Sequence, residues 1–221
     1  MAACGVDFTV AVTEDGELLA CGQGDNGQLG LGAVLHQQQP ARAGGPEFFA
    51  NQRIRLAAAG SYHLAVVAED GAVYTCGDGR LGRLGLGDGE TFRNERNSMI
   101  GKRVSKYFPG HGAFKGTVQE YAIKTDNYLL VYDDGDQETI KYRDLLQYLP
   151  RRRLTRVPQA EFGGSRVVMV SCGGSHTMAM TAAGHVWTCG GNLNGQLGVG
   201  DTANRLGFTQ VDAGHLGARG S

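Results

Sequence analysis

Apolar and polar residues alternate in short runs at both ends of this chain, and glycines separate the runs. The clearest case lies within residues 171–201, where HTMAMT and HVWTC alternate with a period of two. This period predicts two half-buried strands. Gly184 stands between them and supplies the positive φ that a two-residue hairpin turn requires. Residues 171–201 are therefore predicted to form a β-hairpin followed by a glycine-rich tail, GGNLNGQLGVGD.

The same unit occurs three times, in residues 3–32, 58–88 and 171–201. A length close to one further unit separates the second copy from the third. All-β repeats of this size that are rich in turn glycines predict the blades of a β-propeller. The copies align without a gap at Gly5, Gly60 and Gly173, at Gly16, Gly71 and Gly184, and at the Cys-Gly pairs that begin with Cys21, Cys76 and Cys189.

The glycine hairpin, the Cys-Gly pair, His176-Thr177 and GQLG together resemble the regulator of chromosome condensation (RCC) repeat. Phe8 departs from this pattern, because His63 and His176 fill its slot in the other copies. Cysteine also replaces the usual tryptophan before glycine in all three copies. Proteins of this family form seven-bladed rings, so the resemblance implies an all-β fold in which three RCC-type blades form part of a propeller.

Residues outside the three copies lack the alternation. Residues 33–52 contain a glutamine run and two prolines, so we expect them to lie outside the sheets, and we expect the second blade to end at Asp88. The chain enters its first repeat without that repeat's first part, so we expect a fragment of a longer protein. Three blades leave two open sides, so we expect the chain alone to be poorly stable or oligomeric.

Residues 100–150 follow a different pattern. Four short β-rich runs are separated by the turn sequences PGHG, KTDN and DGD, and the segment YRDLLQYL at 142–149 is compatible with one helical turn. Strands of this number and length predict a small closed barrel, inserted in an exposed loop at the propeller rim. We therefore predict three parts: repeats one and two in residues 1–96, the barrel in 97–154 and repeat three in 155–221.

The inserted piece resembles the Tudor domain through VSKY at 104–107, FKG at 114–116 and YLLVYDDG at 128–135. The resemblance to methyl-lysine-reading Tudor domains implies an aromatic cage built from Tyr107, Phe114 and Tyr132, with Asp134 as its anionic wall. A fourth aromatic wall of those readers falls on Asp136 here. The alternative is that the same rings, with Tyr128, form only the core of the barrel.

Charge is distributed unevenly along the chain, although the formal net charge is only −1. Residues 97–156 hold 11 Lys and Arg against 7 Asp and Glu, whereas the remainder is acidic. The densest basic feature is the patch formed by Arg151, Arg152, Arg153 and Arg156. These side chains are suited to salt-sensitive phosphate contacts, but a solvated linker is the simpler interpretation. The composition as a whole is not that of a nucleic-acid binder, so any such contact is expected to be weak.

Catalytic motifs are absent from the sequence: it has no GxSxG, no HExxH and no phosphate-binding loop ending in GK[ST]. His63 and His176 share one repeat slot, which favours a structural hydrogen bond over catalysis. Asp133, Asp134 and Asp136 lack the spacing of a calcium loop and are interpreted as turn residues. We therefore predict a protein that is not an enzyme and that has no cofactor and no metal site.

The five cysteines occupy two repeat slots and form no CxxC pair. We interpret them as buried structural thiols in a reducing compartment, the nucleus or the cytoplasm. No apolar run reaches 18 residues, so no membrane partner is expected.

Three functions follow from these resemblances. The first is a chromatin-associated protein-interaction scaffold that carries a Tudor-like reader, with a methylated histone tail as a partner. The alternatives are a guanine nucleotide exchange factor for a Ran-like small GTPase and a substrate-binding fragment of a larger HECT-type ubiquitin ligase. A UV photoreceptor, another relative, needs clustered tryptophans, and Trp187 stands alone in this sequence.

Overall fold

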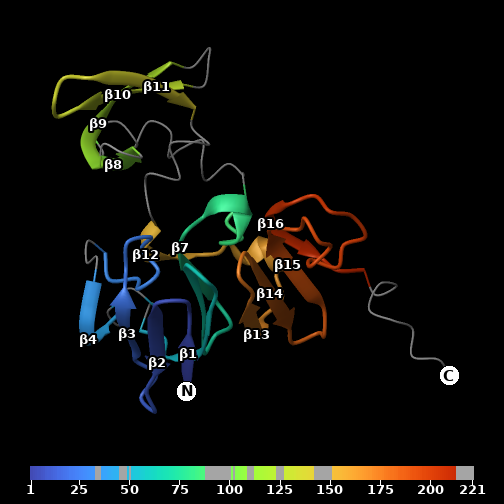
Figure 1. Cartoon of the computed structure of the whole chain (residues 1–221). Helices are drawn as coiled ribbons and strands as arrows, with labels where there is room; N and C mark the ends of the chain where they lie inside the picture. Colours follow the sequence, from blue (N-terminus) through green and yellow to red (C-terminus); the bar gives the residue numbers. More distant parts are fainter. Residues whose placement is uncertain are drawn as a thin grey trace. The chain divides into compact units, whose positions relative to one another are not determined.

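The structure is a computed structural model of the whole chain (Figure 1). It describes residues 1–32, 36–44, 49, 51–87, 101, 103–108, 112–122, 127–141 and 151–212. The chain divides into two compact units: Met1–Gly87 with Arg151–Ser221, and Asp88–Pro150. The predicted part boundaries at 96/97 and 154/155 therefore differ from these divisions by several residues.

The first unit contains three four-stranded antiparallel sheets that lie side by side (Figure 1). Each sheet is one blade, as the repeats predict. The first blade consists, in spatial order, of β1 (Ala2–Cys4), β2 (Phe8–Val12), β3 (Leu18–Gln23) and β4 (His36–Arg42). The third blade consists of β13 (Val167–Cys172), β14 (His176–Thr181), β15 (Val186–Gly190) and β16 (Arg205–Gln210).

Strand β4 corrects one expectation, because residues 33–52 do not all lie outside the sheets. His36–Arg42, with the sequence HQQQPAR, pairs with β3 along the outer edge of the blade. Only one side of an edge strand must supply hydrogen bonds, so Pro40 is tolerated there. Five of the seven residues in β4 are exposed and the other two are half-buried, so neither face of this strand is buried. This explains why no alternating apolar pattern marks the strand.

The second blade is assembled from two distant segments. Its first three strands are β5 (Ile54–Ala59), β6 (His63–Ala68) and β7 (Val73–Gly77), and its fourth is β12 (Arg151–Arg156). Arg156 pairs with Tyr74 and Arg151 with Gly77 across β7. The expectation that this blade ends at Asp88 is therefore wrong, because the insertion separates its third strand from its fourth.

Two apolar layers join the three blades. One lies between the first and second blades and includes Val10, Leu18, Leu64 and Val66. The other lies between the second and third blades and includes Ala65, Val67, Val170 and Ala179. The alternating residues of β6 divide between the two layers, which is why every residue of that strand is buried. The central blade is therefore apolar on both faces.

The glycine that begins each hairpin is required by a close ring contact. A Cβ at Gly60 would lie 2.0 Å from the His63 ring and 2.7 Å from the Gly173 carbonyl oxygen. A Cβ at Gly5 would meet the Phe8 ring at 1.9 Å in the same way. The position three residues before this ring must therefore be glycine, because the ring of Phe8 or His63 occupies the space that a Cβ would need.

The second unit is a four-stranded antiparallel sheet of β8 (Arg103–Phe108), β9 (Gly112–Ala122), β10 (Asn127–Tyr132) and β11 (Gln137–Lys141). The four strand segments predicted from the turn signals all appear. Its buried side chains include Val104, Val118, Tyr128, Leu130 and Ile140. The helical turn expected at 142–149 falls outside the described residues.

Candidate functional site

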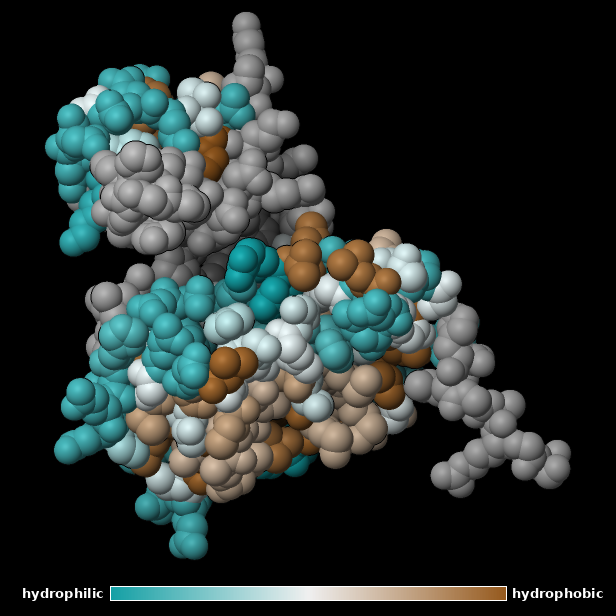
Figure 2. All heavy atoms as spheres, viewed as in Figure 1, coloured by the Kyte–Doolittle hydropathy of each residue, from teal (hydrophilic) through white to brown (hydrophobic). Residues whose placement is uncertain are grey.

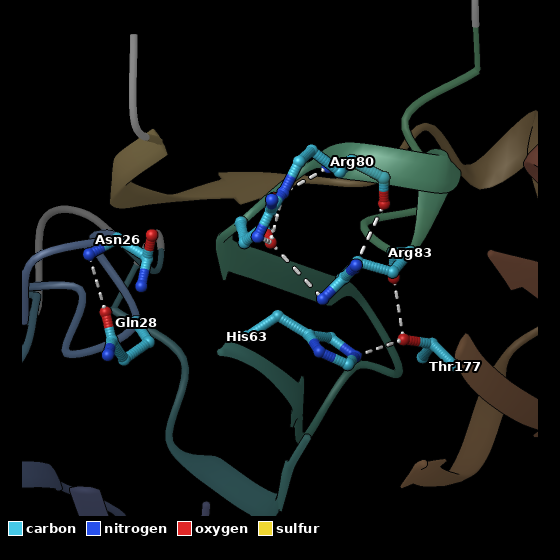
Figure 3. A network of polar contacts seen from close by, with 7 residues as sticks. Asn26, Gln28, His63, Arg80, Arg83 and Thr177 are labelled. Atoms are coloured by element: carbon cyan, nitrogen blue, oxygen red, sulfur yellow. Dashed lines mark hydrogen bonds and ion pairs between the residues drawn. The ribbon is translucent and has the colours of Figure 1, made fainter. Parts of the chain in front are cut away.

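The second and third blades meet at a polar joint centred on Arg83. The first and third copies have glutamine at this repeat position, and Gln28 Oε1 and Gln196 Oε1 accept hydrogen bonds from the backbone N–H groups of Asn26 and Asn194, at 3.0 and 2.9 Å. The second copy has arginine instead. Its short 3-10 helix η1 (Arg80–Gly82) precedes Arg83, whose Nε donates to the Arg80 carbonyl at 3.0 Å. Figure 3 shows the two arrangements.

Asp78 neutralises this buried arginine. Its Oδ2 lies 3.3 Å from Arg83 Nη1, and both side chains are only 6% exposed. Arg80 binds the same carboxylate from the rim through Nε and Nη2, at 2.7–3.0 Å, and its backbone N–H donates to Asp78 Oδ1 at 2.9 Å. One carboxylate therefore holds two guanidinium groups, one of them buried and one more than half exposed.

A chain of hydrogen bonds then crosses to the third blade (Figure 3). Thr177 Oγ1 donates to the Arg83 carbonyl at 2.7 Å and lies 2.9 Å from His63 Nε2. The threonine proton is used toward Arg83, so His63 Nε2–H must be the donor in the second contact. Nδ1 then carries the lone pair, and it is buried with no hydrogen-bond partner among the residues that the structure describes.

This geometry sets the protonation of the joint. Burial, reinforced by the positive charge of Arg83, lowers the pKa of His63 from 6.5 to about 4. Burial alone would raise the pKa of Asp78, but hydrogen bonds from Arg80 and the charge of Arg83 bring the net shift below the usual value. His63 is thus neutral and Asp78 is ionised at neutral pH, as a structural joint requires.

The His63 shift predicts how stability depends on pH. Between pH 6.5 and about 4 the unfolded chain binds a proton at this position and the folded chain does not. The free energy of unfolding should therefore fall as the pH falls through this window, by up to about 1.4 kcal/mol per pH unit from this group. Urea unfolding at a series of pH values measures the slope. The pKa of His176 is also lowered by burial and adds in the same direction.

The variant His63→Phe is the matched control, because Phe8 occupies the same slot in the first repeat. It should reduce the slope between pH 6.5 and 4 while leaving the fold intact. An unchanged slope in this variant would contradict the assignment of the lost stability to His63.

A hollow of about 330 Å³ opens above this joint. The turn before β6 contributes Ser61 and Tyr62, and the turn before β14 contributes Gly174 and Ser175. Arg80, Leu81 and Arg83 complete the lining, so its charged groups are guanidinium groups already paired with Asp78. The hollow offers hydroxyl groups and an apolar side chain to a partner, but no nucleophile paired with a base.

The cysteines are free thiols, but only part of the expectation for them holds. Cys76 and Cys189 are buried, and their thiols donate to the Gln28 and Arg83 carbonyls of the preceding blade, each at 3.7 Å. Burial raises the pKa of both thiols well above the usual value, so neither is a nucleophile at neutral pH. Cys4 is exposed, which corrects its interpretation as a buried thiol.

The residues of the predicted aromatic cage are distributed over three strands and a turn. Tyr132 ends β10, is buried, and donates through its hydroxyl to Glu138 Oε1. It pairs with Gly116 on β9, two residues from position 114, so positions 114 and 132 share one face of the ladder. Position 107 pairs with Ala113 and belongs to the opposite face. The side chains of Tyr107 and Phe114 are outside the described part of the structure.

Asp134 lies in the exposed turn after Tyr132. Its Oδ1 accepts the backbone N–H of Asp136 at 3.1 Å, and the side chains of Asp133, Asp134 and Asp136 all reach solvent. Among the residues that the structure describes, no three His, Cys, Asp or Glu side chains gather as metal ligands. The turn is therefore an acidic surface directly beside a tyrosine.

The predicted basic patch lies in a strand and not in a linker. Residues 151–156 form β12, the edge strand of the second blade, and Arg156 is exposed. Positive charge on an edge strand discourages pairing with other chains, and this role would explain a run of arginines in β12 without any ligand. Phosphate contact by Arg151, Arg152 and Arg153 stays a prediction.

Comparisons with known proteins agree with this architecture. Residues 15–67 match the family model of the regulator of chromosome condensation (RCC1) repeat, and residues 54–83 and 167–196 match a second model of the same repeat. The chain therefore contains RCC1 repeats. Residues 101–149 match the model described as PTM/DIR17-like, Tudor domain. This RCC1-repeat protein therefore carries a Tudor domain within its second blade.

Curated relatives and solved structures contain the same repeats. The Ultraviolet-B receptor UVR8 of Arabidopsis thaliana is 33% identical over 215 residues, which are 95% of this chain and 45% of that protein. The E3 ubiquitin-protein ligase HERC2 of Homo sapiens is 29% identical over 86% of this chain and 4% of its own length. The chain thus spans less than half the length of these relatives.

The crystal structure of Prp20p from Saccharomyces cerevisiae resembles this RCC1-repeat protein with a TM-score of 0.61 at 18% identity, covering 96% of this chain and 38% of that one. This likeness supports the propeller fold. Within the described ranges, no helix has the length and apolar character needed to span a bilayer.

Proposed function

We propose that this protein is a non-enzymatic interaction scaffold of the nucleus or cytoplasm, in which the propeller presents a Tudor domain that binds a methylated lysine or arginine peptide. The observation that carries the proposal is the exposed acidic turn, Asp133–Asp136, directly after Tyr132 in a Tudor domain. The insertion follows the third strand of the second blade and precedes the fourth, so both of its ends are tied to the propeller.

A methylated ammonium group has lost hydrogen bonds and kept its charge. Aromatic faces attract such a cation by about 0.5–2 kcal/mol for each favourable contact, and a carboxylate adds charge neutralisation. Asp134 supplies that carboxylate, and Phe114 and Tyr132 occupy positions on one face of the ladder. Asp136 stands where an aromatic wall is expected, so we expect weak binding in which acidic residues contribute a larger share.

The ionisable groups of the propeller favour a scaffold over an enzyme. Asp78 is paired with both Arg80 and Arg83, and His63 is held neutral by burial. Cys76 and Cys189 are protonated and buried. These groups are used to join blades. No described contact favours the exchange-factor or the ligase-fragment alternative over the scaffold.

The test is a fluorescence-anisotropy titration of the 221-residue protein with a trimethyl-lysine histone peptide and its unmethylated counterpart. We expect the methylated peptide to bind more tightly and Asp134→Asn to weaken that binding by about 1 kcal/mol, near fivefold, because the substitution removes a charge and keeps the turn hydrogen bond. Phe114→Ala should abolish binding.

Glu120→Gln is the matched control, because it removes an exposed carboxylate from β9 of the same sheet. It should leave the affinity close to that of the wild type. Equal binding of the two peptides would show that methylation is not read, and loss of binding by Phe114→Ala only together with unfolding would assign that ring to the core.

A further inference from the structure

The hollow above the joint between the second and third blades has one uncompensated positive charge. Arg80 and Arg83 are both paired with the same carboxylate, that of Asp78 (Figure 3). Two guanidinium groups and one carboxylate leave one positive charge, and neither arginine pairs with another carboxylate of the described residues. Arg80 is 57% exposed and lines the hollow, so this charge is accessible from solvent.

Arg80 has donors that Asp78 does not use. A guanidinium group carries five N–H donors. Arg80 binds Asp78 through Nε and Nη2, and its Nη1 contacts no acceptor within the described ranges. The edge formed by Nη1 and Nη2 can therefore bind a second carboxylate while the Nε edge remains on Asp78. Such arginine–carboxylate contacts are charge-assisted and directional.

Two hydroxyl groups add to the polar lining of the hollow. Ser61 lies in the turn before β6 and Ser175 in the turn before β14, so each blade contributes one. Neither hydroxyl forms a hydrogen bond with another residue that the structure describes. Each can therefore donate its proton to an oxygen atom of a ligand.

Leu81 supplies an apolar wall, and its backbone is strained. Its φ of +61° is left-handed, whereas Asn26 and Asn194, at the same position of the other copies, avoid this region. Residues held in such a conformation cluster at binding sites. The Leu81 side chain is 40% exposed and lies against Gly191 of the third blade, where a Cβ would be 3.1 Å from Cδ1. Figure 2 shows strongly hydrophilic atoms beside strongly hydrophobic atoms around η1.

The joint between the first and second blades carries the opposite charge. Asp7 and Asp25 occupy the positions of Tyr62 and Arg80 there, and both are exposed. Like charges repel and opposite charges attract, so an anion is disfavoured at the first joint and favoured at the second. The repeated fold thus presents its basic hollow at one joint and an acidic surface at the equivalent place on the other.

We propose that the hollow binds an acidic segment of a partner protein, in which an aspartate or glutamate stands next to an apolar residue. The carboxylate pairs with the Nη1 edge of Arg80 and accepts hydrogen bonds from Ser61 and Ser175, while the apolar residue packs on Leu81. A carboxylate carries one negative charge and balances the surplus charge of the hollow. A phosphate group carries about −1.5 to −2 and would leave an excess of negative charge. This site belongs to the propeller and does not depend on the Tudor domain.

An NMR titration of the 15N-labelled 221-residue protein tests the proposal. The probes are acetyl-Leu-Glu-Leu-amide and its counterpart with glutamine in place of glutamate, each added to about 20 mM, where a site of millimolar affinity is largely filled. We expect the glutamate peptide to shift the amide signals of Ser61, Leu81 and Ser175. It should bind about tenfold more tightly than the glutamine peptide, because its hydrogen bonds are charge-assisted.

Three variants assign the contacts. Arg80→Gln should remove the preference for glutamate, and it should fold because Asp78 keeps its contact with Arg83. Arg42→Gln is the matched control: Arg42 is also half-exposed and paired with a carboxylate, that of Glu17 at 3.0 Å, and this variant should bind like the wild type.

Leu81→Asn introduces the residue type of the other two repeats. It should weaken binding of the glutamate peptide about threefold, because an apolar contact is lost. It should not lower the free energy of unfolding, because asparagine tolerates the left-handed conformation better than leucine does. Weaker binding without a loss of stability distinguishes a binding residue from a structural one.

Several results would overturn the proposal. One is the absence of shifts around the hollow up to the highest peptide concentration, and another is equal affinity for the two peptides. A third is an Arg80→Gln protein that still prefers glutamate. Tighter binding of the corresponding phosphoserine peptide would assign the hollow to phosphate and refute the choice of a carboxylate. Unchanged binding by Leu81→Asn would contradict the contact given to Leu81.

Discussion

Replacing Asp78 by alanine should lower the free energy of unfolding by about 3–5 kcal/mol. The side chain is 6% exposed and is the carboxylate partner of Arg83, which is buried to the same degree between the second and third blades. Removing the carboxylate leaves a buried guanidinium group uncompensated. It also frees Arg80, whose Nε and Nη2 bind the same two oxygens. Equilibrium urea unfolding measures the loss.

The first repeat supplies the control for this experiment, since Gln23 and Gln28 occupy the positions of Asp78 and Arg83. The double variant Asp78→Gln with Arg83→Gln removes both charges together and should be far more stable than Asp78→Ala. If the double variant loses as much as the single one, the cost does not come from an unpaired charge, and the account of the joint is wrong.

Replacing Gly190 by alanine should cost about 3 kcal/mol or more. Its φ of +112° lies in a region that side chains with a Cβ rarely adopt, which costs about 1–3 kcal/mol. The added Cβ would also lie 2.5 Å from the Ser175 carbonyl oxygen and 2.6 Å from the His176 Cα. Both obstacles belong to the backbone of the hairpin, so the blade must distort, at a further cost of about 1–3 kcal/mol.

Gly195→Ala separates the two causes. Gly195 has φ +73°, and a Cβ there meets nothing within 4 Å, so only the backbone conformation is penalised, by about 1 kcal/mol. Thermal or urea unfolding of both variants should therefore show a clearly larger loss for Gly190→Ala. Similar losses would mean that the close approach across the hairpin contributes nothing.

The fourth strands of two blades show where the sequence pattern stops being informative. HQQQPAR and RRRLTR form β4 and β12, yet neither has the alternation that predicts a strand. Both are edge strands. An edge strand pairs with one neighbour through its backbone and need not bury a full apolar face, so its sequence need not alternate. The insertion site within the second blade follows from the pairing of β12 with β7. These two strands lie more than 70 residues apart in sequence, so their pairing leaves no local signal in the sequence.

The charged pair at the joint could have been predicted from the aligned repeats. The second copy replaces Gln23 with Asp78 and Gln28 with Arg83, so two opposite charges enter the same unit together. Such a paired departure from the repeat indicates an ion pair. The repeat alignment does not show that it is buried, or that His63 and Thr177 continue it into the next blade, because these depend on how neighbouring blades pack.

The sequence by itself determined the hairpins, their tight glycine turns, the three-blade repeat and the four strands of the Tudor domain. Local alternation and turn chemistry specify all of these within a few residues. Only the tertiary structure decided which faces are covered, which distant strand completes the second blade, and that positions 107 and 114 fall on opposite faces of the Tudor sheet. Register and blade packing join residues far apart in the chain, and a change of one residue in register exchanges the two faces.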